Sequence, residues 1–375
     1  MSDAMLEISN VDKFYGPVDL GVHAVKDISM TVEPGSIVAL LGSSGCGKTS
    51  TLRMIAGFEA VSRGTILIAG REVQNLPPVK RNVAMAFEGY SLYPTVTVRD
   101  NIAFALKSSG KPAAEIASKV AQVAAMLEIT DMLDRYPSSI SGGQQQRASL
   151  ARALIRDADL YLLDEPMGQL EPQLRTLLRG RIKHYIKERG MTAILVTHDQ
   201  TEANALADKI AVMENGELQQ YASPEDIKEA PANLFTGTFV GEPPMNAFDA
   251  QARATSEAVV FSLQNGTQLS FPKSAFNSKL RHRITEMGKV TLGVRPYAIH
   301  RSDAGAQARV LANQWLGDQS HIAAEFAGGS LVLVEHDRAH LREGDEIAVR
   351  LNPRDLHIFD PKTGSAISHG DSLVG

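Results

Sequence analysis

The sequence predicts an α/β domain followed by an all-β domain, and three observations support this division. At 36–56 a short apolar segment runs into a glycine-rich loop and then into a helix-compatible segment. In the middle of the chain, apolar strands alternate with helical segments, which is typical of a largely parallel sheet with helices on both faces. After about residue 235, short β-branched runs are separated by turn residues, which indicates a small all-β barrel.

Length and composition are those of an ordinary globular protein with two domains. The 375 residues are 43% hydrophobic and 22% charged, which excludes a disordered or fibrous chain. The net charge of −5 excludes a global basic field for nucleic acid. The single cysteine, Cys46, excludes an intrachain disulfide and suits a reducing compartment. There is no signal-peptide pattern and no apolar run near the roughly 18 residues that span a bilayer, so we expect a soluble or peripheral protein.

The first third of the chain is expected to combine strands, a loop and one helix. Val22–Val32 is β-branched and apolar, and Ser36–Leu41 is almost wholly apolar, as a strand buried on both faces should be. Lys48–Ala56 is helix-compatible and ends at Gly57, a typical helix C-cap. The segment 65–74 holds two short runs on either side of a glycine, which predicts a hairpin.

The middle third is predicted to be largely helical, with two further strands. We expect a mixed sheet with a helical subdomain at about 89–158, within a first domain that spans 1–236. The predicted elements are helices at Lys111–Leu133, Gln144–Ile155 and Arg175–Arg189, the last with a solvated basic face, and apolar strands at Leu160–Leu163 and Ala193–Val196.

The second domain is expected to span 237–375 and to form an OB-like barrel. Phe239–Asn246 contains a glycine and two prolines and predicts a linker. Short β-branched runs follow, and we expect the chain to end in a polar tail. The predicted strands are Glu257–Leu263, Val290–Val294, Ala308–Leu311, Ser330–Val334 and Glu346–Leu351.

A phosphate-binding loop is predicted at Gly42-Ser43-Ser44-Gly45-Cys46-Gly47-Lys48-Thr49, which fits G-x-x-x-x-G-K-[ST]. Its glycines let backbone N–H groups surround phosphate oxygens, and the helix that follows adds its positive N-terminal dipole. Lys48 would reach the outer phosphates, Thr49 would help hold Mg²⁺, and Ser50 is counted as nucleotide-binding. A chance glycine-rich turn is the alternative, and the flanking strand and helix reject it. We expect the helix N-terminus to lower the pKa of the Cys46 thiol.

Two carboxylates follow the apolar strand Leu160–Leu163. Asp164 is the candidate ligand for magnesium, and Glu165 is placed to polarise the attacking water. The alternative is a strand that ends in solvated acids, which is common. In a chain that also carries a phosphate-binding loop, the catalytic interpretation is favoured.

A second helix start with phosphate-binding character is predicted at Ser141-Gly142-Gly143-Gln144-Gln145. Ser141 is a natural N-cap, and the two glycines allow the backbone to approach a ligand closely. A simple capped helix is the alternative. The motif lies about 20 residues before Asp164, in the same chain as a phosphate-binding loop, and this order favours a ligand.

These motifs together resemble the ATP-binding subunit of an ATP-binding-cassette (ABC) transporter. Gly42–Thr49 resembles the first nucleotide motif, Ser141–Gln145 the cassette signature, and Leu160–Glu165 the second nucleotide motif with its catalytic glutamate. His198 resembles the switch histidine that senses the γ-phosphate, and Tyr15 resembles the aromatic residue that stacks on adenine. A turn residue and a packed strand residue are the respective alternatives for these two.

The resemblance extends over nearly the whole chain. Phe239–Asn246, Leu292–Pro296 and His357–Asp360 resemble the appended TOBE-like domain of importer ATPases that serve carbohydrate-type substrates. This implies either a regulatory docking surface or a dimer stabiliser. The family also implies two cassettes arranged head to tail, with ATP clamped between the phosphate loop of one and the Ser141–Gly143 helix start of the other.

The resemblance further implies cofactors, partners and a location. The cofactors are ATP and Mg²⁺, and the second cassette is a copy of this chain or a related paralogue. Two membrane-spanning permease subunits would convert cassette closure into alternating access, a solute-binding protein would act indirectly, and no nucleic acid is expected. The location would be peripheral, at the cytoplasmic face of the inner or plasma membrane.

Two positions depart from the family pattern. Glu88 stands where a Gln that touches magnesium and water is usual, and Glu171 stands where an Asp is usual at the cassette interface. A carboxylate remains a suitable magnesium ligand, so Glu88 is kept as a metal candidate. In a homodimer, Glu88 and Glu171 would each occur twice, and the added negative charge near the phosphates would be unfavourable. This favours pairing with a related, non-identical cassette.

The sequence therefore predicts an ATP-hydrolysing subunit of an importer for a sugar, polyol or glycerol-type solute. The Glu88 and Glu171 variants resemble glycerol-uptake cassettes. The alternatives are a soluble ABC ATPase that is not coupled to transport and a weakly hydrolytic nucleotide-binding partner subunit.

Overall fold

The computed structural model describes residues 4–108 and 110–373. The chain divides into two compact units, unit 1 (Met1–Pro224) and unit 2 (Glu225–Gly375). The sequence analysis placed the domain boundary later, at 236/237. Within the described ranges, no helix is long and apolar enough to cross a membrane.

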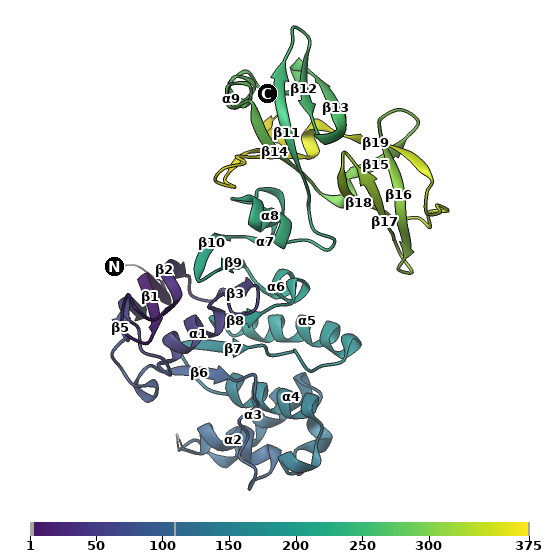
Figure 1. Cartoon of the computed structure of the whole chain (residues 1–375). Coiled ribbons are helices and arrows are strands. Elements are labelled where there is room, and N and C mark those ends of the chain that lie inside the picture. Colours follow the sequence, from purple (N-terminus) through teal and green to yellow (C-terminus); the bar gives the residue numbers. More distant parts are fainter. Residues whose placement is uncertain (1–3, 109, 374–375) are drawn as a thin grey trace. The chain divides into compact units, whose positions relative to one another are not determined.

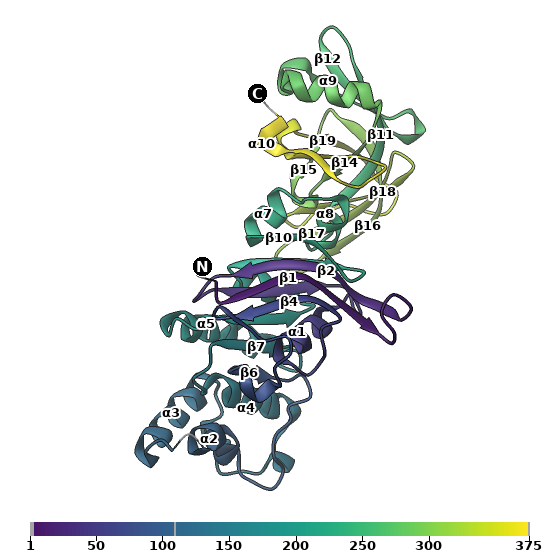
Figure 2. The same cartoon turned by 90° about the vertical axis from the view of Figure 1, so that its left-hand side faces the viewer.

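Unit 1 contains an antiparallel sheet with the strand order β2-β1-β4-β5, of which β1, β2 and β4 are labelled in Figure 2. Leu6 in β1 is opposite Val32 on one side and Ile68 on the other. Leu6 and Ile8 are buried with Glu7 between them, as expected for a strand with one core-facing side, and this alternation changes phase at the register shift between Ile8 and Val11. The predicted hairpin at 65–74 is formed by β4 and β5. The strands are β1 (Leu6–Tyr15), β2 (Val22–Val32), β4 (Arg63–Ile68) and β5 (Arg71–Glu72).

The second sheet of unit 1 has the order β10-β9-β3-β8-β7-β6. The pairs β3–β9, β3–β8, β8–β7 and β7–β6 are parallel, and β9–β10 is antiparallel. Every residue of β3, β7 and β8 is buried, which confirms the predicted mixed sheet with apolar central strands. The strands are β3 (Ile37–Gly42), β6 (Val83–Ala86), β7 (Leu160–Asp164), β8 (Ala193–Thr197), β9 (Lys209–Glu214) and β10 (Glu217–Ala222).

The helices of unit 1 form two sets, one beside the strands of the second sheet and one that forms the helical subdomain (Figure 1). The first contains α1 (Lys48–Ala56), α5 (Pro172–Glu188) and α6 (Gln200–Leu206), and the helical subdomain contains α2 (Val98–Ser108), α3 (Ala113–Met126) and α4 (Gly142–Leu154). The predicted helix at Lys111–Leu133 is too long. It ends at Met126, because Glu128 has a left-handed φ of 54° that a continuing helix cannot contain. A 3₁₀ turn at Thr130–Met132 follows.

Unit 2 is built from two antiparallel sheets with the orders β13-β12-β11-β14-β20-β21 and β15-β19-β16-β17-β18. The all-β prediction is confirmed, and helix α9 packs on β11 and β14. The strands are β11 (Asn246–Ala254), β12 (Ala258–Ser262), β13 (Gln268–Pro272), β14 (Lys289–Val294), β15 (Ile299–Ser302), β16 (Ala306–Trp315), β17 (Ser320–Phe326), β18 (Gly329–Glu335), β19 (Glu346–Leu351), β20 (Leu356–Phe359) and β21 (Ala366–His369). The helices are α7 (Pro224–Glu229), α8 (Leu234–Phe239), α9 (Ser278–Met287) and α10 (Gly370–Leu373).

The prediction of a polar C-terminal tail is wrong. β21 pairs with β20, and Leu373 of α10 is fully buried in the core of unit 2. The Asn277 backbone N–H donates to the carbonyl of Leu373 at 2.8 Å. The sequence did not reveal this arrangement because one partner of the segment, Asn277 at the start of α9, lies 95 residues before Ser372, to whose carbonyl its side chain donates.

Candidate functional site

The topology of the second sheet of unit 1 brings the predicted catalytic residues to one edge. The phosphate loop follows β3, Glu165 follows β7, His198 follows β8 and Glu88 lies just after β6. These strands are parallel neighbours in the order β3-β8-β7-β6. Their carboxyl ends therefore meet at the same edge, where open α/β sheets bind ligands.

The phosphate loop is held in a conformation that requires glycine. Gly47 has a φ of 101°, and a Cβ at this position would lie 2.6 Å from the carbonyl oxygen of Ala24. Lys48 is buried, and its ammonium group donates to the carbonyls of Gly42 and Ser43, at 2.8 Å each. The ammonium is therefore inside the curve of the loop. Ser44 and Gly45 are exposed at its tip, and Thr49 and Ser50 are half-buried at the start of α1.

Cys46 differs from the prediction. Its side chain is only 2% exposed, and burial raises the pKa of its thiol, although Lys48 opposes this shift. The Lys48 ammonium lies 3.7 Å from Sγ. The expected lowering of the pKa is wrong, because loss of hydration outweighs the nearby positive charge.

Tyr15 lies beside the start of α1. Its hydroxyl is 3.0 Å from the Ser50 hydroxyl, and 42% of the residue is exposed. The ammonium group of Lys13 lies 4.8 Å from the centre of the ring. An exposed ring face next to the phosphate loop can accept a flat base by stacking.

Asp164 is a buried carboxylate with an unused oxygen. It is 4% exposed, and its Oδ1 has no hydrogen-bond partner among the described residues. Burial, followed by the charges of Glu88 and Glu165, raises its pKa to about 6, while Arg53 and Lys48 oppose the shift. Such an oxygen can serve a bound cation. No group of three or more His, Cys, Asp or Glu residues that could hold a metal occurs in the described part of the chain.

Glu165 and His198 form a hydrogen-bonded pair. The Nδ1 atom of His198 is 2.9 Å from Oε1 of Glu165, with side chains that are 69% and 16% exposed, respectively. Glu165 has a left-handed φ of 47°, which is strained for a residue with a side chain. Its backbone N–H donates to the carbonyl of Val196 in β8 at 3.0 Å.

The predicted N-cap at Ser141 is confirmed. Its hydroxyl accepts from the Gln144 backbone N–H, and the Gln144 side chain accepts from the Ser141 backbone N–H, which forms a reciprocal capping box. Gly142, which follows Ser141, allows side chains of the same protein to approach the helix start closely. A Cβ at Gly142 would lie 2.8 Å from Oε1 of Gln169 and 3.1 Å from the Tyr90 hydroxyl.

Three features of the site were not recognised in the sequence. The side chain of Gln146 in α4 contacts the turn that contains Glu165. Arg175 and Arg179, which were expected to be solvated, both pair with Asp199, the N-cap of α6. Glu202 is buried, and its Oε2 accepts from the Thr197 hydroxyl at 2.6 Å. Of these features, only the Asp199 cap could have been found from the sequence, because Asp is a preferred N-cap and here it directly precedes a helix.

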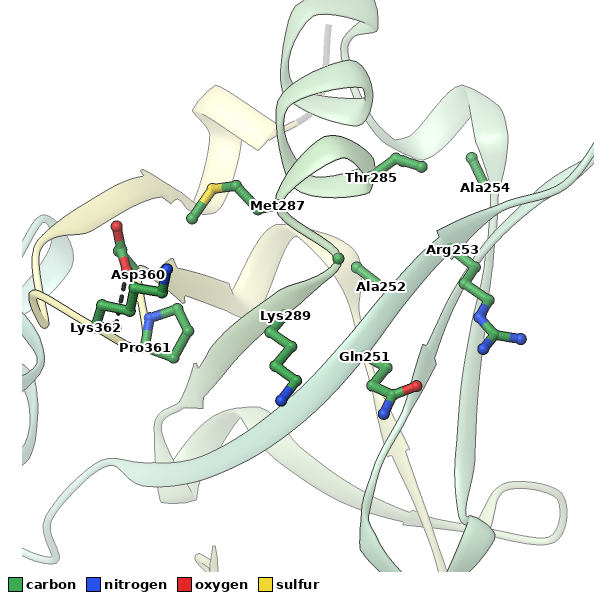
Figure 3. Close-up of a pocket in the computed structure, with 11 residues that line it drawn as sticks. Gln251, Ala252, Arg253, Ala254, Thr285, Met287, Lys289, Asp360, Pro361 and Lys362 are labelled. Carbon is green, nitrogen blue, oxygen red and sulfur yellow. Dashed lines mark hydrogen bonds between the residues drawn. The ribbon is translucent and has the colours of Figure 1, made fainter.

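Unit 2 contains a separate open hollow of about 1140 Å³, lined mainly by residues of β11, the end of α9 and the loop after β20. Its charged lining residues include Arg253, Lys289, Asp360 and Lys362. Arg253 and Lys362 lie on opposite sides of the hollow in Figure 3. Because its cations do not converge on one point, this hollow is a weaker candidate than the sheet edge of unit 1.

The family model for ABC transporters matches residues 25–168, and the model for the TOBE domain matches residues 292–359. The chain is 37% identical over 365 residues to an sn-glycerol-3-phosphate import ATP-binding protein of Cereibacter sphaeroides, covering 96% of this chain and 99% of the relative. It is 38% identical over 380 residues to a trehalose/maltose import ATP-binding protein of Thermococcus litoralis, covering 97% and 100%.

A third relative is a xylose/arabinose import ATP-binding protein of Haloferax volcanii, 38% identical over 378 residues, covering 96% of this chain and 95% of the relative. Among solved structures, the post-hydrolysis dimer of the ATP-binding cassette MJ0796, bound to ADP and Pi, has a TM-score of 0.55 and 25% identity. This match covers 59% of this chain and 99% of the cassette. The chain therefore belongs to the ATP-binding subunits of ABC importers, and it is an ATPase with an α/β nucleotide-binding domain and a C-terminal TOBE domain.

Proposed function

We propose that this ATPase energises the uptake of a sugar, polyol or glycerol-type solute. The import proteins of Cereibacter, Thermococcus and Haloferax are named for glycerol phosphate or sugars, and each is similar over nearly the whole chain. The observation that supports the hydrolytic part of the proposal is the contact between Glu165 and His198, at the end of the sheet from which the phosphate loop also starts. This arrangement suits the hydrolysis of a bound nucleotide.

Each residue of the edge has a proposed role in hydrolysis. Lys48 would exchange its loop carbonyls for phosphate oxygens, and Tyr15 would stack on adenine. Glu165 would accept a proton from the attacking water, and His198 would orient Glu165 and contact the γ-phosphate.

We propose Mg²⁺ as the cation at this edge. Asp164 has a buried oxygen without a partner, and Thr49 lies next to Lys48 at the start of α1. Mg²⁺ keeps several waters and takes phosphate oxygens, so a small set of protein ligands is sufficient. Glu88 lies near enough to Asp164 to raise its pKa and is the further candidate ligand. When bound, the cation would neutralise charge on the outer phosphates.

A second cassette would complete the site. The start of α4, with Ser141, Gly142, Gly143 and Gln144, would bind the nucleotide held by the phosphate loop of the partner cassette. The partner is a copy of this chain or a related paralogue. Glu88 and Glu171 favour the paralogue, because a homodimer would place each extra carboxylate near the nucleotides twice.

The segment Glu88–Thr97 is the proposed docking site for a short cytoplasmic helix of a permease subunit. Tyr93 and Phe104 are exposed, with ring centres 4.9 Å apart. They line a hollow of about 450 Å³. Arg152 of α4 donates to the carbonyl of Ser91 at 2.7 Å, so movement of the signature helix would reach this surface directly.

The chain would then lie at the cytoplasmic face of the membrane, as a peripheral subunit with two permease partners and no nucleic acid.

Reconstitution tests the proposed function. The chain would be expressed with the permease, cassette and solute-binding proteins encoded beside it, and placed in liposomes that contain ATP. We expect uptake of one radiolabelled sugar, polyol or glycerol phosphate, and none with the Glu165→Gln variant. ATP hydrolysis without uptake of any solute in this group would contradict the proposal. The mass of the assembled complex distinguishes two copies of this chain from one copy paired with a related paralogue.

A further inference from the structure

The side chain of Gln146 joins the signature helix to the turn after β7. Gln146 is in α4 and is 3% exposed. Its Nε2 donates to the backbone carbonyl of Glu165 at 2.7 Å, and its Oε1 accepts from the backbone N–H of Gln169 at 2.9 Å. Both ends of this buried amide are therefore used on a single turn.

The backbone of Glu165 depends on such anchors. Its left-handed φ of 47° costs energy and persists only where the surroundings enforce it. The N–H of Glu165 is held by the Val196 carbonyl, and its own carbonyl accepts from Gln146 and, at 3.3 Å, from the Gly168 N–H. These bonds fix the direction in which the Glu165 side chain leaves the backbone, toward His198.

The turn also packs on the first residues of α4. A Cβ at Gly143 would lie 3.1 Å from the carbonyl oxygen of Gln169. Together with the approach of the Gln169 side chain to Gly142, this places the turn against the helix start as well as against Gln146. The helix and the turn are thus in contact both at the two glycines and at Gln146. Only the Gln146 contact consists of hydrogen bonds.

We propose that Gln146 is a positioning residue, which makes the placement of the Glu165 carboxylate follow the placement of the signature helix. The inference rests on the proposed role of Glu165 in accepting a proton from water. When α4 moves against a nucleotide held by the opposite cassette, the Glu165 turn moves with it. Glu165 serves the nucleotide held by the phosphate loop of its own chain, so the engagement of α4 at one nucleotide directs the base at the other, and hydrolysis is tied to cassette closure.

Two substitutions test the donor and the acceptor of Gln146 separately. Gln146→Met keeps the length and removes both hydrogen bonds. Gln146→Glu keeps an acceptor for Gln169 but turns an oxygen toward the Glu165 carbonyl. In the complex assembled with the permease and cassette partners, with Mg-ATP, we expect kcat to fall on the order of 100-fold in both, the scale of a small misplacement of a reacting group, with an unchanged KM for ATP.

Hydrogen exchange gives a readout that is independent of turnover. The Gln169 amide should exchange faster in Gln146→Met than in the parent, whereas Gln146→Glu should retain its protection because the acceptor remains. Equal exchange at Gln169 in all three proteins would overturn the contact on which the inference rests.

A matched control separates positioning from general loss of stability. Asn246 of unit 2 is also a buried amide, and its side chain donates to and accepts from the backbone of Val332, at 2.8 and 2.7 Å. Asn246→Asp removes one donor from a comparable environment. It should lower the melting temperature and leave kcat unchanged.

A double-mutant cycle decides whether Gln146 acts through Glu165. In the Glu165→Gln background, the Gln146 variants should cause no further loss of turnover. A full further loss would indicate general damage and overturn the inference. Parental kcat in both Gln146 variants, with Glu165→Gln inactive, would overturn the inference alone. Parental turnover of Glu165→Gln would instead remove the proposed role of Glu165.

Discussion

Both units of the chain bury ionisable side chains, but they satisfy them differently. In unit 1, Asp164 and Glu202 are buried carboxyls that each keep an oxygen without a partner in the described part of the chain. In unit 2, Arg295 is equally buried, yet its terminal nitrogens donate to the carbonyls of Gly237, Val240 and Lys228. The contrast is between two carboxyls that each leave an oxygen open and a guanidinium whose terminal nitrogens are used within the chain, although Arg295 Nε and Asn313 Oδ1 of unit 2 also lack a partner among the described residues.

Removing the catalytic carboxylate should have the largest effect. Glu165→Gln should leave ATP binding intact and lower turnover by about 10²–10⁴-fold, because a positioned general base contributes this much. Steady-state hydrolysis and equilibrium binding of labelled ATP measure the two quantities. The comparison of the units breaks down if Glu165→Gln hydrolyses ATP at nearly the parental rate.

Removing the guanidinium from unit 2 should act on stability instead. Arg295→Met leaves three buried carbonyls without their donor, and we expect unit 2 to lose about 3 kcal/mol of unfolding free energy. Denaturant unfolding measures this loss. The affinity of unit 1 for ATP should stay the same, and a reduced ATP affinity with unchanged stability would reverse the assigned roles.

Lys48→Met should weaken nucleotide binding. The ammonium group is lost from the phosphate loop, and a charged hydrogen bond of this kind contributes roughly 10–100-fold in affinity. Binding of labelled ATP at equilibrium is the measurement, with the melting temperature as control. Normal ATP affinity in this variant would refute the phosphate-loop assignment.

The pH dependence of stability should carry the signature of Glu202. Burial raises the pKa of Glu202 to about 7, partly opposed by the Thr197 hydroxyl and Arg179 and supported by Asp199 and Glu165. The protonated form thus favours the fold, and this contribution is lost as the pH rises through about 7. Glu202→Gln should remain more stable than the parent at about pH 8, by about 1–2 kcal/mol, and should lose that advantage at about pH 4.

Unit 2 should show the opposite dependence. Burial, with the charges of His369 and Arg295, lowers the pKa of His357 to about 3. The neutral form favours the fold, so this stability is present above about pH 6.5 and is lost as the pH falls. Thermal unfolding of the two units from acid to alkaline pH measures both trends, and parallel trends in the two units would contradict the comparison.

Cys46 should give the smallest effect. Because its thiol is buried and its pKa is raised, iodoacetamide should label the folded chain slowly, with or without Mg-ATP, and rapidly in denaturant. The chain has one cysteine, so the label reports this site alone. Rapid labelling of the folded protein that ATP prevents would instead support the lowered pKa of Cys46 that the sequence predicted.

The sequence predicted features that depend on neighbouring residues and missed those that depend on distant ones. The phosphate loop, the Ser141 cap and the strand that ends at Asp164 are local patterns of backbone freedom, capping and apolar character, and the structure reproduces these elements. The pKa of Cys46 depends on burial, and the Gln146 contact joins residues 19 positions apart. Neither has a local pattern.

The order of strands in unit 2 has a consequence for protein synthesis. β14 lies between β11 and β20, and β20 pairs with β21, so this sheet is incomplete until Leu356–Phe359 and Ala366–His369 have left the ribosome. Unit 1 needs nothing beyond Pro224 and can fold while translation continues. A premature stop codon just before Leu356 would therefore release a chain with a complete nucleotide-binding unit and an unpaired, aggregation-prone strand edge at β14.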